Sequence, residues 1–291
     1  MRILLLGGTG SIGTAVVREL VAAGHHILAL SRSETSDGKL TAAGAAAFRG
    51  DLREPEDWAH MVASCAAVVQ VAATFEDDMG EVDRRLVDAL LAATTGPGPR
   101  RRFLYTGGCW LYGATGEDIA TEDGSFNPLS SFAWAVENGE RLLRAGQFST
   151  AILHPAMVYH EEGGVFERFV AQARSGEPLE IWGSPDTRWP LVHRDDLAVA
   201  YRLLLGRPEL TGHFNVAAEE GVRVKQIATA IAGRYGSPKE FPLKAVDDLV
   251  AEHGAWAEGP TLDQQMSAAK LRQATGWAAK VTDFTQAAPC L

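Results

Sequence analysis

The sequence predicts an α/β fold in which a doubly wound parallel sheet is joined to a smaller C-terminal lobe. Short apolar runs alternate with helical patterns through the first half of the chain. A glycine-rich turn directly follows the first apolar run, and glycines and prolines interrupt the chain after about residue 157. Alternation of this kind is typical of repeated β-α-β units, whose parallel sheet carries helices on both faces.

The expected elements follow from the spacing of the apolar residues. Short apolar runs bounded by turn residues predict strands, and apolar residues recurring at helical spacing predict helices. The expected strands are Arg2–Leu6, His26–Leu30, Ala67–Val71, Phe103–Thr106, Ile152–His154 and Pro190–Val192, all in one sheet. The expected helices are Thr14–Ala23, Asp83–Ala93, Phe132–Ala145 and Asp195–Leu205.

The glycine-rich turn is the strongest chemical signal in the chain. It lies between the first expected strand and the first expected helix and reads Gly7-Gly8-Thr9-Gly10-Ser11-Ile12-Gly13. In that context glycines allow tight turning and close approach, while the helix N-terminus faces a pyrophosphate. We therefore expect a dinucleotide-binding Rossmann domain. The residues expected to hold the cofactor at this turn are Gly7, Thr9, Gly10, Ser11, Ile12 and Gly13.

The length and composition leave room for a second lobe. The chain has 291 residues, of which 46% are hydrophobic and 22% charged, enough to bury a full core. We expect the Rossmann domain over residues 1–156, with a return segment at about 188–206. Residues 157–187 and 207–291 would form the substrate-binding lobe, with a strand at Gly212–Ala217 and a helix at Val224–Tyr235.

The loop after the second expected strand favours NADP(H) over NAD(H). A fold that prefers NAD normally has an acid here, which bonds the ribose hydroxyl. This chain has Ser31, Arg32 and Ser33 instead. An arginine forms bidentate, charge-assisted bonds with a 2′-phosphate, and the serines add donors. The alternative is an ordinary exposed arginine after a strand.

Charge and cysteine content exclude several other classes. A formal net charge of −10 disfavours nucleic acid as a partner. Cys65, Cys109 and Cys290 are far apart and lack metal-binding spacing, so we expect neither a disulfide framework nor a bound metal. The apolar start is too short for a signal peptide, and no later run could span a bilayer. We therefore expect a cytoplasmic protein with no membrane partner.

The glycine pattern resembles that of the extended short-chain dehydrogenase/reductase family, which includes sugar-nucleotide epimerases, dehydratases and ketone reductases. Further stretches occur in the family's order: Gly50-Asp51-Leu52, Val71-Ala72-Ala73, Tyr105-Thr106-Gly107-Gly108, His154 to Tyr159, and Leu191 to Asp196. The resemblance implies that Asp51 and Leu52 contact the adenine, and that Val71, Ala72 and Ala73 lie beside the adenosine ribose. It also implies that Thr106 and Pro155 border the nicotinamide, and that the protein forms a homodimer.

The chain departs from this family at its catalytic pair. The family carries a Tyr-x-x-x-Lys pair on one helix, where the tyrosine exchanges a proton with the carbonyl and the lysine holds the ribose. Counting back from Gly139-Glu140, which resembles the family's Gly-Glu after that lysine, places Phe132 and Val136 at the two positions. Neither side chain can transfer a proton. A general acid normally contributes about 10²–10⁴ in rate, so another group must supply the proton.

Two side chains and an ordered water are candidates for this proton transfer, and a third side chain could orient the substrate. Tyr112 is the first, against the alternative of a packing tyrosine with a satisfied hydroxyl. Thr106 could orient a carbonyl, or its hydroxyl could simply bond nearby backbone. His160 could donate a proton near neutral pH, although a lone histidine is more often structural.

Aromatic and apolar residues predict a substrate pocket of low polarity. They occur in segments that line the resembled family's cleft, although several of them could equally belong to the core. The expected pocket residues are Trp110, Tyr112, Phe132, Trp134, Val136, Met157 and Trp189. A nucleotide-sugar pocket would need basic groups for a diphosphate, and Arg168, Arg174 and Arg188 form no convincing pattern for it.

The function expected from these residues is that of an atypical NADP-dependent oxidoreductase. Its small-molecule substrate would be a fairly apolar carbonyl or conjugated compound. One alternative is a non-redox cyclase, isomerase or lyase that keeps the pocket. The other is a binding protein that senses the redox state of NADP without turning it over.

Overall fold

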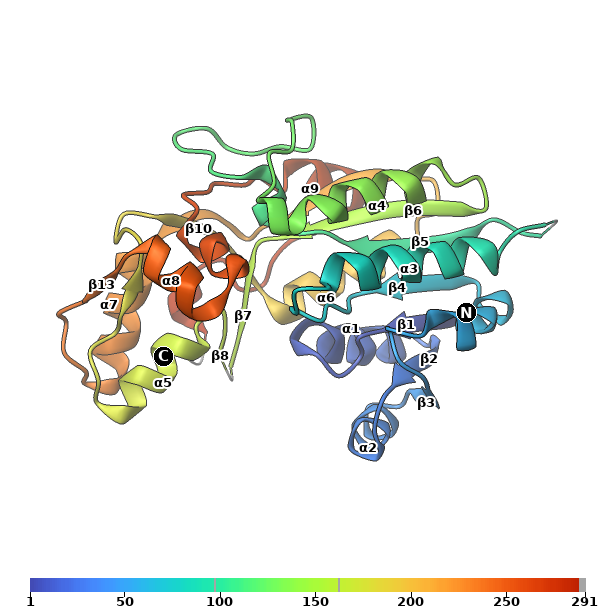
Figure 1. Cartoon of the computed structure of the whole chain (residues 1–291), viewed down its shortest axis with the longest axis horizontal. Coiled ribbons are helices and arrows are strands. Elements are labelled where there is room, and N and C mark those ends of the chain that lie inside the picture. Colours follow the sequence, from blue (N-terminus) through green and yellow to red (C-terminus); the bar gives the residue numbers. More distant parts are fainter. Residues whose placement is uncertain (97, 162, 288–291) are drawn as a thin grey trace. The chain divides into compact units, whose positions relative to one another are not determined.

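The computed structural model describes residues 1–96, 98–161 and 163–287 (Figure 1). Contacts divide the chain into two compact units. The first comprises Met1–Gly107, Phe132–His154 and Leu197–Phe214. The second comprises Gly108–Ser131, Pro155–Asp196 and the chain from Asn215 onward.

The first unit is built around a mostly parallel sheet, which has seven strands among the described residues. The strands are β1 (Arg2–Leu6), β2 (His26–Ser31), β3 (Ala46–Arg49), β4 (Ala67–Gln70), β5 (Arg101–Thr106), β6 (Phe148–Pro155) and β11 (Gly212–Val216). Their order is β11-β6-β5-β4-β1-β2-β3. The chain therefore adds strands on one side of β1 and then, from β4, on the other. Ligands of such sheets bind at this switch point, outside the carboxyl ends of the strands.

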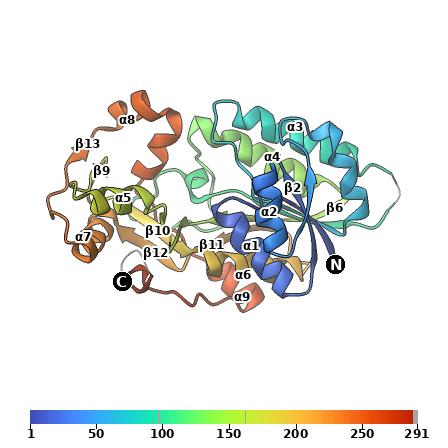
Figure 2. The ribbon, with the colours of Figure 1, turned by 90° about the horizontal axis from the view of Figure 1, so that it is seen from below.

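Helices cover both faces of this sheet. They are α1 (Ser11–Ala22), α2 (Glu34–Ala42), α3 (Met79–Ala92), α4 (Ala133–Arg144) and α6 (Arg194–Leu205). Helices α3 and α4 pack together on one face, and α1 and α6 lie on the other (Figure 2). Residues Ile3 to Leu6 of β1 are fully buried, as expected for a strand that is covered on both faces. The predicted doubly wound α/β class is confirmed.

The second unit contains smaller sheets. A four-stranded sheet has the order β12-β10-β7-β8, and β9 pairs with β13 in a second sheet, all among the described residues. The strands are β7 (Met157–His160), β8 (Gly163–Gly164), β9 (Ile181–Trp182), β10 (Arg188–His193), β12 (Glu219–Arg223) and β13 (Leu243–Lys244). The helices are α5 (Glu167–Ser175), α7 (Val224–Tyr235), α8 (Val246–His253) and α9 (Ala269–Thr275).

Short 3₁₀ helices join these elements. They are η1 (Pro55–Asp57), η2 (Ala59–Ser64), η3 (Cys109–Tyr112), η4 (Ser130–Phe132), η5 (Ala255–Thr261) and η6 (Phe284–Gln286). Cys65 and Cys109 are buried free thiols, whereas Cys290 lies outside the described residues. None of the helices in the described part of the chain combines the length and the hydrophobicity that a membrane-spanning segment needs.

Two strands lie in sheets other than those expected. The expectation that Pro190–Val192 extends the main sheet is wrong, because β10 pairs with Met157–Tyr159 and with β12 in the second unit. Conversely, the strand expected at Gly212–Ala217 in the lobe forms β11, at the edge of the seven-stranded sheet. Both segments are apolar and short, and only their distant pairing partners decide the sheet.

The compact units also differ from the domain ranges expected from the sequence. Residues 108–131 cluster with the second unit, although they follow β5 directly in the chain. Their backbone bonds to residues far ahead: the Thr115 N–H donates to Asp263 O at 2.9 Å, and the Ala120 N–H to Gln265 O at 2.8 Å. The division of labour between a cofactor domain and a substrate lobe stays a prediction.

Candidate functional site

The turn after β1 has a shape that only glycine allows. Gly7 has a φ of +88°, and a Cβ there would lie 2.7 Å from Ala72 Cα. A Cβ on Gly13 would lie 1.9 Å from Gly7 O. The Gly10 N–H closes the turn by donating to Gly7 O at 3.1 Å. The turn therefore packs tightly against the carboxyl end of β4, and any side chain at Gly7 or Gly13 would force it open.

Helix α1 begins directly at this turn. Its N-cap is Gly10, and no side chain caps it. The first N–H groups of a helix lack intrahelical partners and carry partial positive charge, which suits a pyrophosphate. A Cβ on Gly10 would meet nothing closer than Gly7 O at 3.5 Å, and Ser11 is exposed. The glycine cradle and the open helix end thus fit a nicotinamide dinucleotide.

At the end of β2, the three residues expected to bind a 2′-phosphate differ in their exposure and in their hydrogen bonds. Ser31 is buried, and its hydroxyl donates to Ser33 O at 3.2 Å. The Ser33 hydroxyl caps α2 by accepting from the Ser36 N–H at 3.2 Å. Arg32 is exposed and has no ion-pair partner among the described residues. Arg32 is therefore the exposed cation at this strand end, beside the N-terminus of α2 that Ser33 caps.

The two stretches expected to hold the adenosine lie side by side. The Asp51 carboxylate accepts from the Arg53 N–H at 2.9 Å, and its carbonyl accepts from Trp58 Nε1 at 2.7 Å, which fixes the turn. Leu52 lines a small cavity of about 20 Å³ together with Ala72 and Ala73. The Val71 N–H donates to Leu6 O at 3.0 Å, so this backbone continues alongside β1.

Thr106 ends β5, and its hydroxyl is already engaged. Its Oγ1 donates to Gln70 O at 2.5 Å and lies 2.6 Å from the Tyr201 hydroxyl. If Thr106 gives its proton to Gln70 O, Tyr201 must donate to Thr106. Burial raises the pKa of Tyr201, which favours this protonated form. No motif in the sequence singles out Tyr201, and a role for Thr106 in orienting a carbonyl stays a prediction.

A buried carboxyl that no sequence motif indicated lies under the same strand ends. Asp83 of α3 is 6% exposed. It accepts hydrogen bonds from Tyr105 Oη at 2.5 Å, Asn138 Nδ2 at 2.8 Å and Gln70 Nε2 at 3.1 Å. Burial raises the pKa of Asp83. The one available signal was an acid on the apolar face of a helix, where Leu86 lies one turn further on.

Helix α4 and its N-cap carry the two positions at which the resemblance places the catalytic pair. Phe132 precedes its first turn and is buried, and Val136 lies four residues on, so that both side chains share a face. The Trp134 ring instead packs against Gly80 of α3. It leaves no room for a side chain there, because a Cβ on Gly80 would lie 2.8 Å from Trp134 Cδ1. Trp134 also lines the small cavity beside Leu52. It is therefore placed near the expected adenosine residues.

In the second unit, Tyr112 has a satisfied hydroxyl. Its Oη donates to Asn215 Oδ1 at 2.7 Å, and the ring lies 5.0 Å from that of Phe126. The Asn215 N–H in turn donates to Glu122 Oε1 at 2.7 Å. Burial raises the pKa of Tyr112, so the phenol holds its proton firmly. A role for Tyr112 as proton donor stays a prediction.

Of the other expected residues of this unit, His160, Met157 and Trp189 are buried and Trp110 is half-buried. His160 and Met157 lie on β7, and β6 ends at Pro155. Trp189 Nε1 donates to Pro260 O at 2.8 Å. A Cβ on Gly259 would lie 2.5 Å from Trp110 Cδ2, so this ring packs on backbone. Both tryptophans contact protein groups, and substrate contact by any of these residues stays a prediction.

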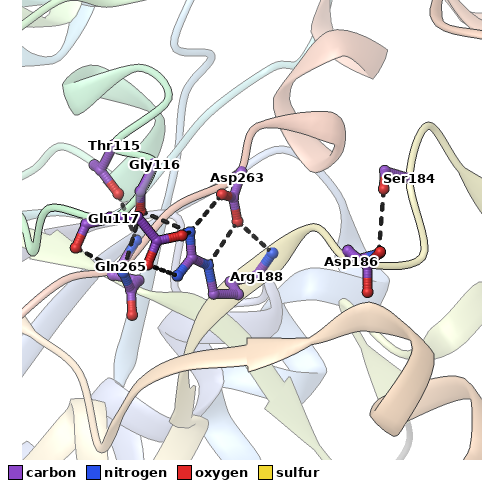
Figure 3. A network of polar contacts seen from close by, with 8 residues as sticks. All are labelled: Thr115, Gly116, Glu117, Ser184, Asp186, Arg188, Asp263 and Gln265. Carbon is purple, nitrogen blue, oxygen red and sulfur yellow. Dashed lines mark hydrogen bonds and ion pairs between the residues drawn. The ribbon is translucent and has the colours of Figure 1, made fainter.

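The three arginines weighed for a diphosphate are engaged by other groups. Arg188 Nη2 lies 2.7 Å from Asp263 Oδ2 and 3.2 Å from Glu117 Oε1, and it also donates to Gly116 O (Figure 3). The guanidinium of Arg168 lies between two aromatic rings, those of Phe169 and Trp182, and burial lowers its pKa to about 10. Arg174 lies 5.7 Å from the centroid of the Tyr235 ring. Binding of a diphosphate by Arg188 would require breaking two ion pairs.

One group of side chains has a spacing that could suit a metal ion. Ligand atoms of Glu161, His193 and Asp195 lie within 4.8 Å of one another. His193 Nδ1 accepts from the Asp195 N–H at 3.3 Å, so its other nitrogen carries the proton toward Glu161. Arg194 Nη2 lies 3.3 Å from Glu161 Oε2 and neutralises that acid. These contacts favour an ion-pair cluster over a cation site.

Two known proteins are similar to this chain over most of their length. An uncharacterized protein of Schizosaccharomyces pombe is 26% identical over 95% of this chain and 94% of its own length. The 2′-dehydrokanamycin reductase of Streptomyces kanamyceticus is 25% identical over 97% of this chain and 83% of its own.

The fold also matches solved structures. UDP-glucose 4-epimerase of Thermus thermophilus, in complex with NAD, superimposes with a TM-score of 0.81 at 22% identity, covering 100% of this chain and 97% of that one. The model of the NAD dependent epimerase/dehydratase family matches residues 3–217, well over half of the 291 residues. The chain therefore belongs to the NAD-dependent epimerase/dehydratase family, whose members are NAD(P)-dependent oxidoreductases, epimerases and dehydratases.

Proposed function

We propose that this protein is an NADP(H)-dependent reductase of a small, fairly apolar carbonyl or conjugated compound, working without the usual tyrosine and lysine pair. The observation that carries the proposal is that the first unit keeps the features of a cofactor site but lacks side chains for proton transfer. The glycine cradle at Gly7 and Gly13 is intact, and Arg32 is exposed at the ribose end, with no ion-pair partner in the described chain. At the same time Phe132 and Val136 occupy the positions of the proton-transfer pair.

The chain's own residues would hold the cofactor in three places. The backbone of Gly7–Gly13 and the first turn of α1 bind the pyrophosphate. Arg32 binds the 2′-phosphate, and the turn at Asp51 and Leu52 contacts the adenine. When bound, the reduced nicotinamide supplies the hydride for the substrate.

The proton would come from water or from His160. The Tyr112 and Thr106 hydroxyls already donate to other groups, and burial raises the pKa of Tyr112. Losing a placed general acid costs about 10²–10⁴ in rate. This loss matters least for a conjugated substrate, because its developing negative charge is delocalised and needs less help at the oxygen.

The second unit supports a small substrate. Arg188 is bound by two carboxylates, and Arg168 lies between aromatic rings. Neither is free to clamp a nucleotide diphosphate. The relative named 2′-dehydrokanamycin reductase supports a reductase activity, whereas the engaged arginines favour a ligand without a diphosphate.

The substitutions on α4 also favour a second candidate function. Phe132 and Val136 would suit a protein that binds NADP(H) and reports its redox state without turnover. Transfer of hydride to any product distinguishes the two functions.

The first test of the proposal is the choice between cofactors. We would titrate the protein with NADPH, NADP, NADH and NAD by calorimetry. Replacing Arg32 by alanine removes charge-assisted bonds, and we expect NADPH affinity to fall at least about tenfold with NADH affinity unchanged. Arg144→Ala is the matched control, because this exposed arginine lies on α4. Absence of binding by all four at millimolar concentration would overturn the proposal.

A further inference from the structure

A cavity of about 620 Å³ lies in the first unit at the amino ends of two strands. It is bordered by the start of β5, by the turn that leads into β6 and by the chain that follows α3. Because β5 and β6 are parallel, this edge of the sheet is opposite the carboxyl ends, where the cofactor is expected. Small-molecule sites have volumes of roughly 300–1,000 Å³, so the cavity is large enough for a metabolite.

The charged groups that line this cavity are arginines. Among the described lining residues, Arg100 and Arg101 carry charge, and there is no acid. Neither arginine has an ion-pair partner in the part of the chain that the structure describes. This is unusual in a protein with a formal net charge of −10, where acids outnumber bases. The cavity is therefore a positively charged place in an acidic protein.

Both guanidinium groups have unused donors. Arg100 Nε donates to Phe148 O at 2.6 Å, and its two Nη groups have no hydrogen-bond partner among the described residues. Arg101 donates from Nε to Cys65 O and from Nη2 to Ala63 O, each at 3.2 Å, which leaves Nη1. A guanidinium presents five N–H donors in a planar fork that matches phosphate and carboxylate groups. The backbone bonds thus hold the two side chains in place, and the remaining donors are available to an anion.

The nearby end of α3 does not explain these charges. The C-terminus of a helix carries partial negative charge and attracts cations. Here, however, hydroxyl groups bond the last carbonyls of the helix. Thr94 Oγ1 donates to Leu90 O at 2.8 Å. Thr95 Oγ1 donates to Ala92 O at 2.8 Å. The carbonyls that the two arginines bond belong to other segments, so the arginines are not the caps of this helix.

A third arginine adds to the local positive charge. Arg102 follows on β5 and is 4% exposed. It donates to Leu204 O and Ser149 O, each at 3.1 Å, while its Nη2 has no partner in the described structure. Burial, together with the charge of Arg100, lowers the pKa of Arg102 to about 10 in spite of the attraction of Glu209. Neighbouring like charges repel, and a bound anion would offset that repulsion.

We propose that this cavity is a second ligand site, which binds a small polyanion with phosphate or carboxylate groups at Arg100 and Arg101. The anion would accept charge-assisted hydrogen bonds from the unused Nη groups. A polynucleotide fits less well, because the net charge of −10 repels a long phosphate backbone. The site goes beyond the proposed function and does not depend on it, because it lies at the edge of the sheet opposite the expected cofactor.

Calorimetric titration with two polyanions tests the site. Pyrophosphate stands for ligands with phosphate groups, and citrate stands for ligands with carboxylate groups. We expect at least one of them to bind, and the tighter of the two identifies the chemistry of the ligand. Absence of binding by both at millimolar concentration would overturn the inference.

Two substitutions change the cavity in different ways. Arg100→Gln removes one cation, and we expect the affinity for the polyanion to fall at least about tenfold. Thr95→Glu adds an acid to the lining and leaves both arginines with their backbone bonds. It should also lower affinity at least about tenfold, while the melting temperature of the free protein does not fall, because the new carboxylate faces two cations. A purely structural role of the arginines predicts unchanged binding by Thr95→Glu, and that result would overturn the inference.

The controls separate this site from the rest of the molecule. Arg32→Ala removes an exposed arginine that has no ion-pair partner in the described chain, at the carboxyl end of β2. We expect it to leave the affinity for the polyanion unchanged. A loss equal to that of Arg100→Gln would indicate general attraction by charge and would overturn the inference. Addition of NADPH should not displace the polyanion. Complete displacement would place the polyanion in the cofactor site, which would overturn the inference and leave the proposed function intact.

Discussion

Replacing Asp83 by alanine should destabilise the first unit strongly. The carboxylate accepts hydrogen bonds from Tyr105, Asn138 and Gln70, at 2.5, 2.8 and 3.1 Å. The substitution leaves the Tyr105 hydroxyl and the Asn138 amide without their acceptor in a buried place, whereas Gln70 Nε2 keeps its bond to Ala72 O at 3.2 Å. Each buried donor without a partner costs about 1–3 kcal/mol. We expect these donors to shift and form some hydrogen bonds with water in the small cavity. We therefore predict a loss of about 3–5 kcal/mol in the free energy of unfolding.

Urea denaturation followed by circular dichroism measures this loss. Glu81→Ala is the matched control, because Glu81 is an exposed acid on the same helix that pairs with its neighbour Arg84. The control should leave the denaturation midpoint nearly unchanged. The reasoning is refuted if Asp83→Ala unfolds at the same urea concentration as the control, because Tyr105 and Asn138 would then have found other acceptors.

Three further predictions concern pH, the glycine cradle and the catalytic positions. Burial raises the pKa of Asp83 above its ordinary value of 3.8, so its stabilising effect is full below that value and falls as the pH rises through the folded pKa. Unfolding measured across pH should therefore show the stability of the unsubstituted protein falling relative to Asp83→Asn, and a constant difference would contradict this. Gly13→Ala should abolish NADPH binding in calorimetry, because its Cβ would lie 1.9 Å from Gly7 O; unaltered affinity would show that the turn does not hold the cofactor. Combining Phe132→Tyr with Val136→Lys should raise the turnover of an accepted carbonyl by about 10²–10⁴, measured from nicotinamide absorbance, and no gain would mean that the chain already has an efficient proton donor.

Local patterns predicted the first unit well. Strand β1 has the predicted bounds of Arg2–Leu6, because its apolar run ends abruptly at the glycine turn. Helix α1 begins at Ser11, three residues before the expected start, because the turn itself leads into the helix. Helix α2 was not predicted: it buries only Leu40, so it has almost no apolar periodicity to detect.

Features that depend on distant contacts could not be predicted. Strand β10 looks like any buried strand, and only its pairing with β7 and β12 assigns it to the second unit. The partners of Asp83 come from three separate segments, so one sequence shows only an acid on an apolar helix face. The positive φ of Phe75 leaves no signal in the residue type, since phenylalanine is disfavoured there.

The most direct test of the central claim is isotope transfer. The protein would be incubated with NADPH that carries deuterium at the transferred position, together with a panel of small conjugated carbonyl compounds, and the products analysed by mass spectrometry. We predict a reduced product with one deuterium, formed more slowly by Arg32→Ala and at an unchanged rate by the control Arg144→Ala. Tight NADPH binding without transfer of deuterium to any compound would contradict the claim and favour the redox-sensing function.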